Sequence, residues 1–449
     1  MKKGMIGLEI HTYLVTKQKL FCSCLNSRKK GTKPNVNICP ICTGQPGSKP
    51  LSPSEEAVFK ATQLGMMLGC KINNKMHWQR KHYSWPDLPK GYQITLSGSG
   101  AIPLGVNGKF HGIRIGSMHL EEDPASWDPE TGAIDYNRSG LPLVEIVTDP
   151  DFTTSEEVIS WLDKLTKHLS YLGIVDSDAG IKVDVNVNIP GKTERVEIKN
   201  INSMENISVA IESEFERQEK EGSVRETRRF NPETGKTERM RSKEGAEDYR
   251  FLRDPDLPLL YLDSHFLESA LKLLPEDPEK RKKRFIDEFN ISEKEADTVT
   301  KDRYVADLFE NATKEVGREL ALTWVAGELL RLLNTNNCRL QDIEFKDEHF
   351  LALLKMIKNG DLTPLKGKEI LKQFYPKSFM PSNTEKRITD KKELETIIKK
   401  VISENQKVAE DYKQGNKNSL NFLLGQVMKA TKKMADSATS IDILTSLLS

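Results

Sequence analysis

The sequence predicts an α+β fold, in which a sheet-rich N-terminal domain precedes an all-α domain and a small helical tail. Up to about residue 290 the chain is dense in Gly, Pro and Asn, and segments such as MIGLEIHTYLV alternate apolar and polar residues. A period of two is typical of half-buried strands. Later segments such as HFLALLKMIKNG and KELETIIKKVISEN have helical periodicity. Strands mixed with packing helices, and then helices alone, indicate a mixed or antiparallel sheet domain joined to helical ones.

Composition excludes several classes of protein. The 449 residues include 67 Lys and Arg against 66 Asp and Glu, and 37% are hydrophobic. At roughly 150 residues per domain, this length predicts two or three domains. No apolar run approaches the ~20 residues of a membrane span. The formal net charge of +1 argues against a histone-like binder, although a basic patch can bind nucleic acid when the total charge is balanced.

The N-terminus and the cysteines bear on location. Residues 1–7 lack the apolar stretch of roughly 7–15 residues that a signal peptide carries behind its lysines. Six cysteines are too few for a disulfide scaffold, which indicates a reducing compartment. We therefore expect a cytoplasmic protein with no membrane partner. Cys70 and Cys338 stand alone and are interpreted as ordinary buried cysteines.

Four elements of the first domain can be predicted with their ends. Residues 5–15 form a strand whose apolar side chains share one face. Helical spacing predicts a helix over Thr154–Leu172 and another over Ser203–Glu221, each followed by a glycine that ends it. Residues 181–199 form a hairpin around Pro190-Gly191-Lys192. One face of its first strand is apolar, and the other bears Lys182, Asp184, Asn186 and Asn188.

The change of character along the chain predicts three domains. We expect boundaries that give residues 1–290, 291–385 and 386–449. A basic run, EKRKKR, lies at residues 279–284. Such a run is usually a solvated helix face, and a nucleic-acid contact is the alternative.

Four clustered cysteines predict a metal site. Their spacing, C-x-C-x14-C-x2-C, is suited to a tetrahedral structural Zn²⁺ site with thiolate ligands. The ligands would be Cys22, Cys24, Cys39 and Cys42. Free cysteines that are merely close in sequence, or a redox dithiol, are the alternatives, and nothing around them resembles thioredoxin.

Acidic and imidazole side chains gather on the polar faces of predicted strands. Glu9 and His11 share one face, and His119 and Glu121 share another, with Glu122 following. Further acids and amides stand at Glu145, Asp184 and Asn186. Carboxylates on an inner sheet face are costly unless a cation compensates them, and a hard divalent ion suits oxygen and imidazole ligands. The alternative for each single residue is a salt bridge or a solvated face.

Basic and aromatic residues alternate in residues 78–93, WQRKHYSWPDLPKGYQ. Cations beside stacking rings suit an RNA end or a phosphate-bearing ligand, and an ordinary loop with core aromatics is the alternative. Its cations are Arg80, Lys81 and Lys90, and a similar cluster is Tyr136, Asn137 and Arg138. The sequence contains no P-loop, no Rossmann fingerprint and no nucleophile elbow.

The motifs, in their order, resemble those of the GatB family, whose members are the B subunits of aspartyl/glutamyl-tRNA amidotransferases. The resemblance rests on IGLEIH, FCSC, NVNICPICTGQPG, RKHYSWPDLPKGYQI, HLEEDPAS, DYNRSGLPLVEIVTDPD, VDVNVNIPG, VEIKNINS, ETRRF, MRSKEGAEDYRF and DPDLPLL. It continues through LTWVAGELLRLLN and VAEDYKQGNKNSLNFLLGQVMKATKK, so it covers essentially the whole chain. It implies a cradle-shaped catalytic domain, a helical domain and a YqeY-like tail that binds tRNA.

The resemblance also implies an activity. Such a ligase phosphorylates the side-chain carboxylate of Glu-tRNA(Gln), of Asp-tRNA(Asn), or of both, with ATP and Mg²⁺ as nucleotide and cofactor. Ammonia then replaces the phosphate. No amidase signature occurs in the sequence, so the implied partners are mischarged tRNA, an amidase A subunit, plus a small C subunit. Which of the two tRNAs is used stays open.

Roles follow from the resemblance for residues that match its motifs. Implied ligands of Mg²⁺ are Glu9, His11, Glu122 and Glu145, with Glu121 beside them as a further catalytic residue. Implied contacts to phosphate or to the tRNA acceptor end are Arg80, Lys81 and Lys90. Implied members of the remaining pocket are Tyr136, Asn137, Arg138, Asp184 and Asn186. The four cysteines match the zinc motif of some family members.

A competing class is a non-catalytic RNA-binding scaffold that presents tRNA to another enzyme. Such a scaffold needs basic patches and zinc but no acid-rich pocket, so the acidic strand faces favour catalysis. The archaeal relative GatE carries a large inserted domain. A chain of 449 residues leaves no room for it, which favours the GatB branch.

Overall fold

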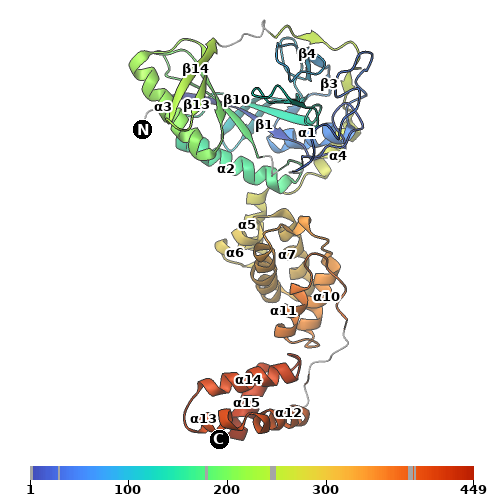
Figure 1. Ribbon diagram of the computed structural model, residues 1–449, viewed down its shortest axis with the longest axis vertical. Helices are drawn as coiled ribbons and strands as arrows, with labels where there is room; N and C mark the ends of the chain where they lie inside the picture. The colour runs from blue at the N-terminus through green and yellow to red at the C-terminus, as the bar shows by residue number, and fades with distance from the viewer. Residues whose placement is uncertain are drawn as a thin grey trace. The chain divides into compact units, whose positions relative to one another are not determined.

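A large mixed sheet forms the centre of the first of two units (Figure 1). The computed structural model describes residues 4–28, 31–176, 180–242, 249–382, 388 and 391–448. The units are Met1–Glu276 and Asp277–Ser449. We expected the first division near residue 290, but helix α5 (Pro278–Phe289) belongs to the second unit. The expected boundary at residues 385–386 and part of the motif MRSKEGAEDYRF lie outside the described residues.

Twelve strands of the described residues make up this sheet, in the order β14-β13-β12-β11-β1-β10-β7-β5-β4-β15, with β6 paired to β7 and β2 to β6. They are β1 (Met5–Tyr13), β2 (Lys71–Ile72), β4 (Gln79–Lys81), β5 (Gln93–Thr95), β6 (Gly105–Phe110), β7 (Ile113–Glu122), β10 (Pro142–Thr148), β11 (Lys182–Asn188), β12 (Val196–Ile201), β13 (Glu226–Asn231), β14 (Lys236–Ser242) and β15 (Leu252–Arg253). Two small sheets pair β3 (Lys75–Met76) with β16 (Leu260–Tyr261) and β8 (Ser126–Trp127) with β9 (Ile134–Asp135). Only β12 and β13 pair in parallel among these strands, so the predicted mixed sheet is confirmed.

Alternation along the strands gives the sheet an apolar and a polar face. In β1 the side chains of Ile6, Leu8 and Ile10 are buried, whereas Glu9 and His11 are half-buried. The apolar side chains share one core with α2 (Ser155–Leu172) and α3 (Met204–Glu221), which run along that side of the sheet (Figure 1). Fully burying one such side chain is worth about 1.5–3 kcal/mol. The apolar face therefore stabilises the domain, and the polar face is free for chemistry.

The two predicted helices of this unit begin and end as expected. The Thr154 hydroxyl accepts a hydrogen bond from the Glu157 amide, and Gly173 ends α2 in the left-handed conformation. The Glu157 carboxylate accepts from the amide and hydroxyl of Thr153. The Ser203 hydroxyl caps α3 in the same way. The other helices among the described residues of this unit are α1 (Glu55–Met67) and α4 (Ser264–Lys272).

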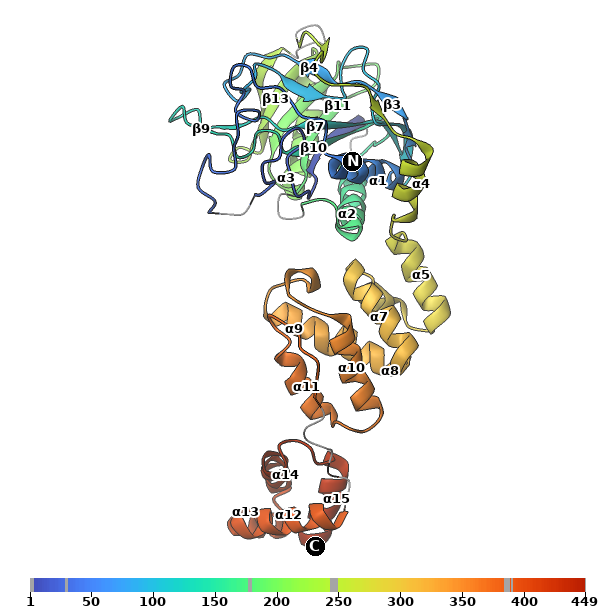
Figure 2. The same ribbon diagram turned by 90° about the vertical axis from the view of Figure 1, so that its right-hand side faces the viewer.

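The second unit is helical throughout its described residues, as predicted (Figure 2). Its first core is built from α5, α6 (Glu293–Val299), α7 (Arg303–Val316), α8 (Arg318–Leu322), the π-helix η1 (Thr323–Leu329), α9 (Leu330–Thr335), the 3-10 turn η2 (Leu340–Asp342), α10 (Asp347–Lys358) and α11 (Pro364–Lys372). A second core is built from α12 (Lys391–Glu404), α13 (Gln406–Lys413), α14 (Asn418–Ala430) and α15 (Ser437–Leu448). None of the described helices has both the length and the apolar character needed to cross a membrane.

The basic run at residues 279–284 is largely engaged inside the second unit. Arg281 is buried and forms ion pairs with Asp307 and Glu310 of α7. Arg284 also pairs with Glu310, at 3.0 Å. The two arginines therefore attach α5 to α7, an internal role that differs from the solvated face and from the nucleic-acid contact expected for this run.

Candidate active site

The polar face of the sheet brings predicted acids of neighbouring strands together. Residues opposite one another in an antiparallel pair project from the same face. His11 of β1 lies opposite Glu145 of β10, and Glu145 lies opposite His119 of β7. On the other side, Glu9 lies opposite Asp184 of β11. The register therefore places the row His119, Glu145 and His11 beside the pair Glu9 and Asp184 on one face of the sheet.

One group on this face, which we call the His11 cluster, consists of His11, Glu121 and Glu145. The His11 Nε2 atom lies 3.7 Å from Glu145 Oε1 and 4.0 Å from Glu121 Oε1. Glu121 is only 3% exposed, and its Oε2 atom has no hydrogen-bond partner among the described residues. A buried carboxylate oxygen without a donor is destabilising unless a cation or a proton satisfies it. The His11 cluster therefore offers the kinds of donor that suit a divalent ion, although, unlike those of Glu9, Asp184 and Glu197, its three ligand atoms do not all lie within 4.8 Å of one another.

The electrostatics of the His11 cluster separate its two carboxylates. Burial, and then the charge of Glu145, raise the pKa of Glu121 to about 7. Burial also raises the pKa of Glu145, but His11, His119 and Lys81 outweigh it and lower that pKa overall. The Lys81 charge acts on both carboxylates. Glu145 is thus the carboxylate that favours the ionised form, whereas Glu121 has a pKa of about 7. A cation bound beside Glu121 would stabilise its ionised form.

His119 of β7 lies opposite Glu145 in the sheet register. Its ring nitrogens contact the Ser117 hydroxyl at 2.9 Å and the Leu96 carbonyl at 3.0 Å. Burial lowers the pKa of His119. Both ring nitrogens are engaged in these contacts, one within β7 and one at the end of β5, and none is left over for a ligand.

A second group, which we call the Glu9 cluster, consists of Glu9, Asp184 and Glu197. Carboxylate oxygens of the three lie within 4.8 Å of one another. The Lys199 ammonium enters this group, 2.6 Å from Asp184 and 3.4 Å from Glu197. Burial lowers the pKa of Lys199, but Asp184 and Glu197 raise it well above its usual value. Asn186 donates to Glu9 at 3.0 Å. Glu9, which was expected among the Mg²⁺ ligands, is therefore grouped with Asp184, which was expected elsewhere in the pocket.

Glu122 has different partners from Glu121, because successive strand residues face opposite sides. Its carboxylate lies 2.6 Å from the Lys90 ammonium and accepts the Ile94 amide at 3.0 Å. Both side chains of the ion pair are almost fully buried. Glu122 and Lys90 thus hold the 90–94 segment to the end of β7, and the structure brings neither to His11.

Arg80 is likewise occupied within the fold. Its guanidinium binds Asp254 at 2.8 Å and Asp256 at 2.9 Å, and lies over the Tyr92 ring at 4.2 Å. Lys81, the next residue, lies over the Tyr249 ring at 4.8 Å. Of the three predicted cations, Lys81 is the one whose charge reaches the His11 cluster.

The Tyr136–Arg138 segment is shared between the cysteine region and β7. The Asn137 carboxamide oxygen accepts the backbone amides of Val36 and Asn37, each at 2.9 Å. Arg138 forms an ion pair with Asp123 at 3.2 Å, and the Tyr13 hydroxyl donates to the same carboxylate at 2.8 Å. Asn137 therefore organises the cysteine loop, while Arg138 reaches the end of β7.

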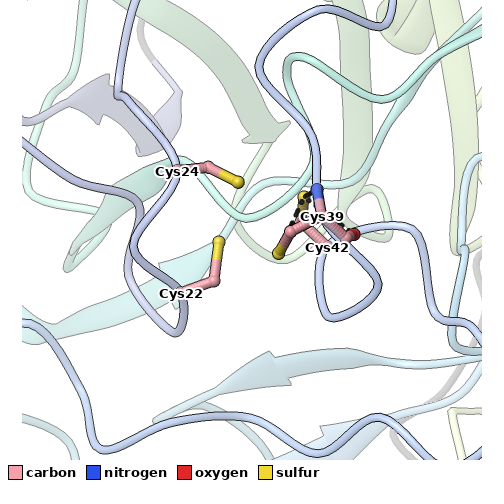
Figure 3. Close-up of side chains that lie close together, drawn as sticks. All are labelled: Cys22, Cys24, Cys39 and Cys42. Carbon is pink, nitrogen blue, oxygen red and sulfur yellow. Dashed lines mark hydrogen bonds between the residues drawn. The ribbon is translucent and has the colours of Figure 1, made fainter.

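The four predicted cysteines converge from two segments (Figure 3). Their sulfur atoms all lie within 4.8 Å of one another, and Cys39 and Cys42 are 3.9 Å apart. Zn–S bonds of about 2.3 Å in a tetrahedron place sulfurs about 3.8 Å apart. A hydrogen bond from Cys22, offset in part by burial, lowers the pKa of the Cys42 thiol. The donor set and its spacing fit a structural zinc ion.

Several site residues were missed in the sequence. Glu197 and Lys199 alternate in VEIKN on the return strand of the predicted hairpin, so their shared face was readable. Their meeting with Glu9 was not, because it depends on β1 lying next to β11. Asp254 and Asp256 gave no signal beyond the motif DPDLPLL.

Comparisons with known proteins give matches along almost the whole chain. A family model described as the GatB/GatE catalytic domain matches residues 4–268, and one described as the GatB domain matches residues 307–448. A protein of Methanopyrus kandleri is 39% identical over 455 residues, which cover 98% of this chain and 97% of the relative. A protein of Methanocaldococcus jannaschii is 39% identical over 464 residues, with the same two coverages. Both are named as the B subunit of an aspartyl/glutamyl-tRNA(Asn/Gln) amidotransferase.

The fold and the site thus define a catalytic sheet domain with an acid-rich face, followed by a helical module. The chain belongs to the GatB/GatE family. The resemblance stated from the motifs is therefore confirmed.

Proposed function

We propose that the chain is the B subunit of a tRNA-dependent amidotransferase, a ligase that converts Glu-tRNA(Gln), Asp-tRNA(Asn), or both, into the amidated product. The single observation that carries the catalytic assignment is the His11 cluster, with its buried and unpartnered Glu121 oxygen. The names of the relatives supply the reaction class. A pure RNA scaffold has no use for buried carboxylates that lack a cation.

The chemistry requires activation of a poor acyl donor. A side-chain carboxylate oxygen of the aminoacyl group attacks the γ-phosphorus of ATP, and ADP leaves. Ammonia then attacks the acyl carbon, and the C–O bond to phosphate breaks to give the amide. Phosphoryl transfer depends on neutralising and aligning charge more than on covalent catalysis.

The residues of the His11 cluster would hold the magnesium ion. A bound Mg²⁺ would neutralise phosphate charge during the transfer. Around it, Glu145 stays ionised because His11, His119 and Lys81 outweigh its burial and lower its pKa. The Lys81 ammonium lies over the Tyr249 ring and its charge reaches both carboxylates of the His11 cluster, which supports a contact between Lys81 and an anionic nucleotide. Arg80 and Lys90 would reach a phosphate only by leaving their carboxylate partners.

The Glu9 cluster would act beside the metal site without a second ion. Lys199 already compensates Asp184 and Glu197, and Asn186 orients Glu9. The charged side chains of Asp184, Glu197 and Lys199 are thus held in place near Glu9, which lies on β1 two residues before His11. We assign this arrangement to positioning of the substrate.

The remaining assignments concern zinc, partners and location. Zn²⁺ at the four cysteines would be structural, because four thiolates leave no open position for substrate. The proposed partners are an amidase A subunit, a small C subunit, plus mischarged tRNA, with the helical tail as the tRNA contact. We place the protein in the cytoplasm.

The function is tested in the assembled complex, in which the chain is joined by its amidase and small partner subunits. ATP hydrolysis should depend on Glu-tRNA or Asp-tRNA and on Mg²⁺. His11→Gln should lower this hydrolysis by at least about 100-fold, the scale of one lost transition-state contact. His265→Gln, at an exposed histidine, is the matched control and should not change it. The proposal would be contradicted if the wild-type complex hydrolysed ATP equally well without the tRNA, or if the His11→Gln complex kept its tRNA-dependent ATP hydrolysis.

A further inference from the structure

A buried lysine lies beside the cysteine site. Lys19 is 1% exposed, and its Nζ atom lies 3.6 Å from Cys42 Sγ and 3.1 Å from the Tyr136 carbonyl oxygen. Burying an ammonium group is strongly unfavourable unless a negative charge lies close to it. The question is which group near Lys19 carries that charge.

The cysteines are the source of negative charge that the geometry offers. Within the described ranges, no carboxylate lies at ion-pair distance from Lys19, whose polar contacts are the Cys42 sulfur and the Tyr136 carbonyl. Four neutral thiols would leave the ammonium uncompensated. Four thiolates around one Zn²⁺ carry a net negative charge. A charged metal site and a buried lysine therefore stabilise each other.

Lys19 also ties the cysteine loop to a turn that leads toward the active site. The Ser139 hydroxyl donates to the Cys42 carbonyl at 2.7 Å, and the Leu20 amide donates to the Gly140 carbonyl at 2.8 Å. With the contact from Lys19 to Tyr136, these bonds fasten both ends of the turn at residues 136–140. The turn is thus positioned by its contacts with the metal loop and with the segment that carries Lys19.

The same turn carries Arg138. Its guanidinium holds Asp123 at 3.2 Å, and Asp123 in turn accepts from the Tyr13 hydroxyl. Asp123 directly follows β7, which supplies Glu121, and Tyr13 stands two residues after His11 on β1. A chain of direct contacts therefore joins the cysteines to two strands of the His11 cluster.

We propose that Lys19 is a positioning residue that couples the metal at the cysteines to Arg138 and Asp123 at the edge of the active site. Its ammonium donates to the Cys42 thiolate and to the Tyr136 carbonyl at once. Loss of either the metal or the ammonium releases the turn. This inference rests on the proposed zinc site and on the proposed active site, and it assigns Lys19 no contact with substrate.

The bond to sulfur is tested on the full-length chain loaded with Co²⁺ in place of Zn²⁺. Lys19→Met keeps the length and removes the donor, and Lys17→Met changes an exposed lysine two residues away. Lys19→Met should move the thiolate-to-cobalt charge-transfer band to longer wavelength, because the thiolate loses a hydrogen-bond donor. Competition with a chromophoric chelator should show zinc affinity lowered by about 10–100-fold. Lys17→Met should match the wild type in both measurements.

The coupling is tested in the assembled complex by tRNA-dependent ATP hydrolysis. Lys19→Met should raise KM for the mischarged tRNA several-fold more than it lowers kcat. In an Arg138→Met background the same substitution should add little, because the contact through which it acts is gone. Ser139→Ala leaves the sulfur untouched, so it should raise KM while the cobalt spectrum stays unchanged. If Lys19→Met fails to fold, Ser139→Ala still tests whether the turn transmits the loss of a contact with the cysteine loop to the active site, and an unchanged KM would overturn the coupling.

The outcomes separate the two assignments. A wild-type chain that binds neither Zn²⁺ nor Co²⁺ would overturn both the zinc site and the role of Lys19. A metal-binding chain in which Lys19→Met and Lys17→Met have the same spectrum and affinity would overturn the role of Lys19 alone. Fully additive effects of Lys19→Met and Arg138→Met would overturn the coupling.

Discussion

The His11 cluster and the Glu9 cluster lie on the same sheet face, but the negative charge of their carboxylates is compensated in different ways. In the Glu9 cluster the chain supplies its own cation, since Lys199 lies 2.6 Å from Asp184. In the His11 cluster an oxygen of Glu121 is left without a partner among the described residues. The comparison teaches that an acid-rich surface is a metal candidate only where the protein has not already neutralised it.

The largest expected effect on activity comes from a substitution at Glu121, the buried carboxylate of the His11 cluster. Glu121→Gln should reduce tRNA-dependent ATP hydrolysis by the assembled complex at least about 100-fold. The free energy of unfolding should not fall, because the substitution removes a buried charge whose Oε2 atom has no hydrogen-bond partner among the described residues. Steady-state assays and urea unfolding measure the two quantities. Glu130→Gln, at an exposed glutamate, is the control, and a large loss of stability without loss of activity would make Glu121 a structural residue.

The next effect is a pH dependence that the His11 cluster alone should show. Burial raises the pKa of Glu121 to about 7, above its value of about 4.3 in an unfolded chain. Its contribution to stability is therefore complete below the unfolded pKa and is lost as pH rises through about 7. Without divalent cations, the stability of the wild type relative to Glu121→Gln should fall by up to about 3 kcal/mol from pH 4.5 to 8. Urea unfolding across this range measures the difference, and a flat difference would show that Glu121 has an ordinary pKa.

A smaller effect is expected when the Glu9 cluster loses its internal cation. Lys199→Met leaves Asp184 and Glu197 uncompensated, and should cost about 2 kcal/mol after allowance for partial exposure. It should also create a response that the wild-type cluster lacks, because a divalent ion could then replace the ammonium. Adding Mg²⁺ should restore part of the lost stability in a Glu121→Gln background, where the His11 cluster cannot contribute. Lys192→Met, at an exposed lysine, should show neither change.

The smallest effect is expected at Asn186, which donates to Glu9 at 3.0 Å. Asn186→Ala should cost about 1 kcal/mol, the usual worth of one hydrogen bond. Turnover should fall only a few-fold, because the His11 cluster is untouched. A loss as large as that of Glu121→Gln would mean that the two clusters act as one site.

Strand alternation was enough to predict which acids share a face. The polar face of β1 and the hairpin of β11 and β12 appeared as expected, and the four cysteines converge as their spacing predicts. Alternation also paired His119 with Glu121, whereas the motif resemblance had placed Glu122 among the ligands. The structure turns Glu122 toward Lys90.

Partners from distant strands were beyond sequence reasoning. Lys199 reaches the Glu9 cluster because β11 stands between β1 and β12 in the sheet, and strand order is a property of the whole fold. Arg80 was interpreted from its local basic and aromatic neighbours and from the motif resemblance, and Arg281 from a local run of charge. Their carboxylate partners lie 174 and 26 or more residues away, so a local pattern cannot reveal that these cations are already occupied.

The central claim is that the cation site is the His11 cluster. Anomalous diffraction from crystals of the full-length chain soaked in Mn²⁺ tests it most directly, because Mn²⁺ scatters anomalously and shares the oxygen preference of Mg²⁺. The account predicts a peak bound by His11, Glu121 and Glu145, and none within the Glu9 cluster while Lys199 is present. A peak among Glu9, Asp184 and Glu197, or no peak on the polar face at all, would contradict it.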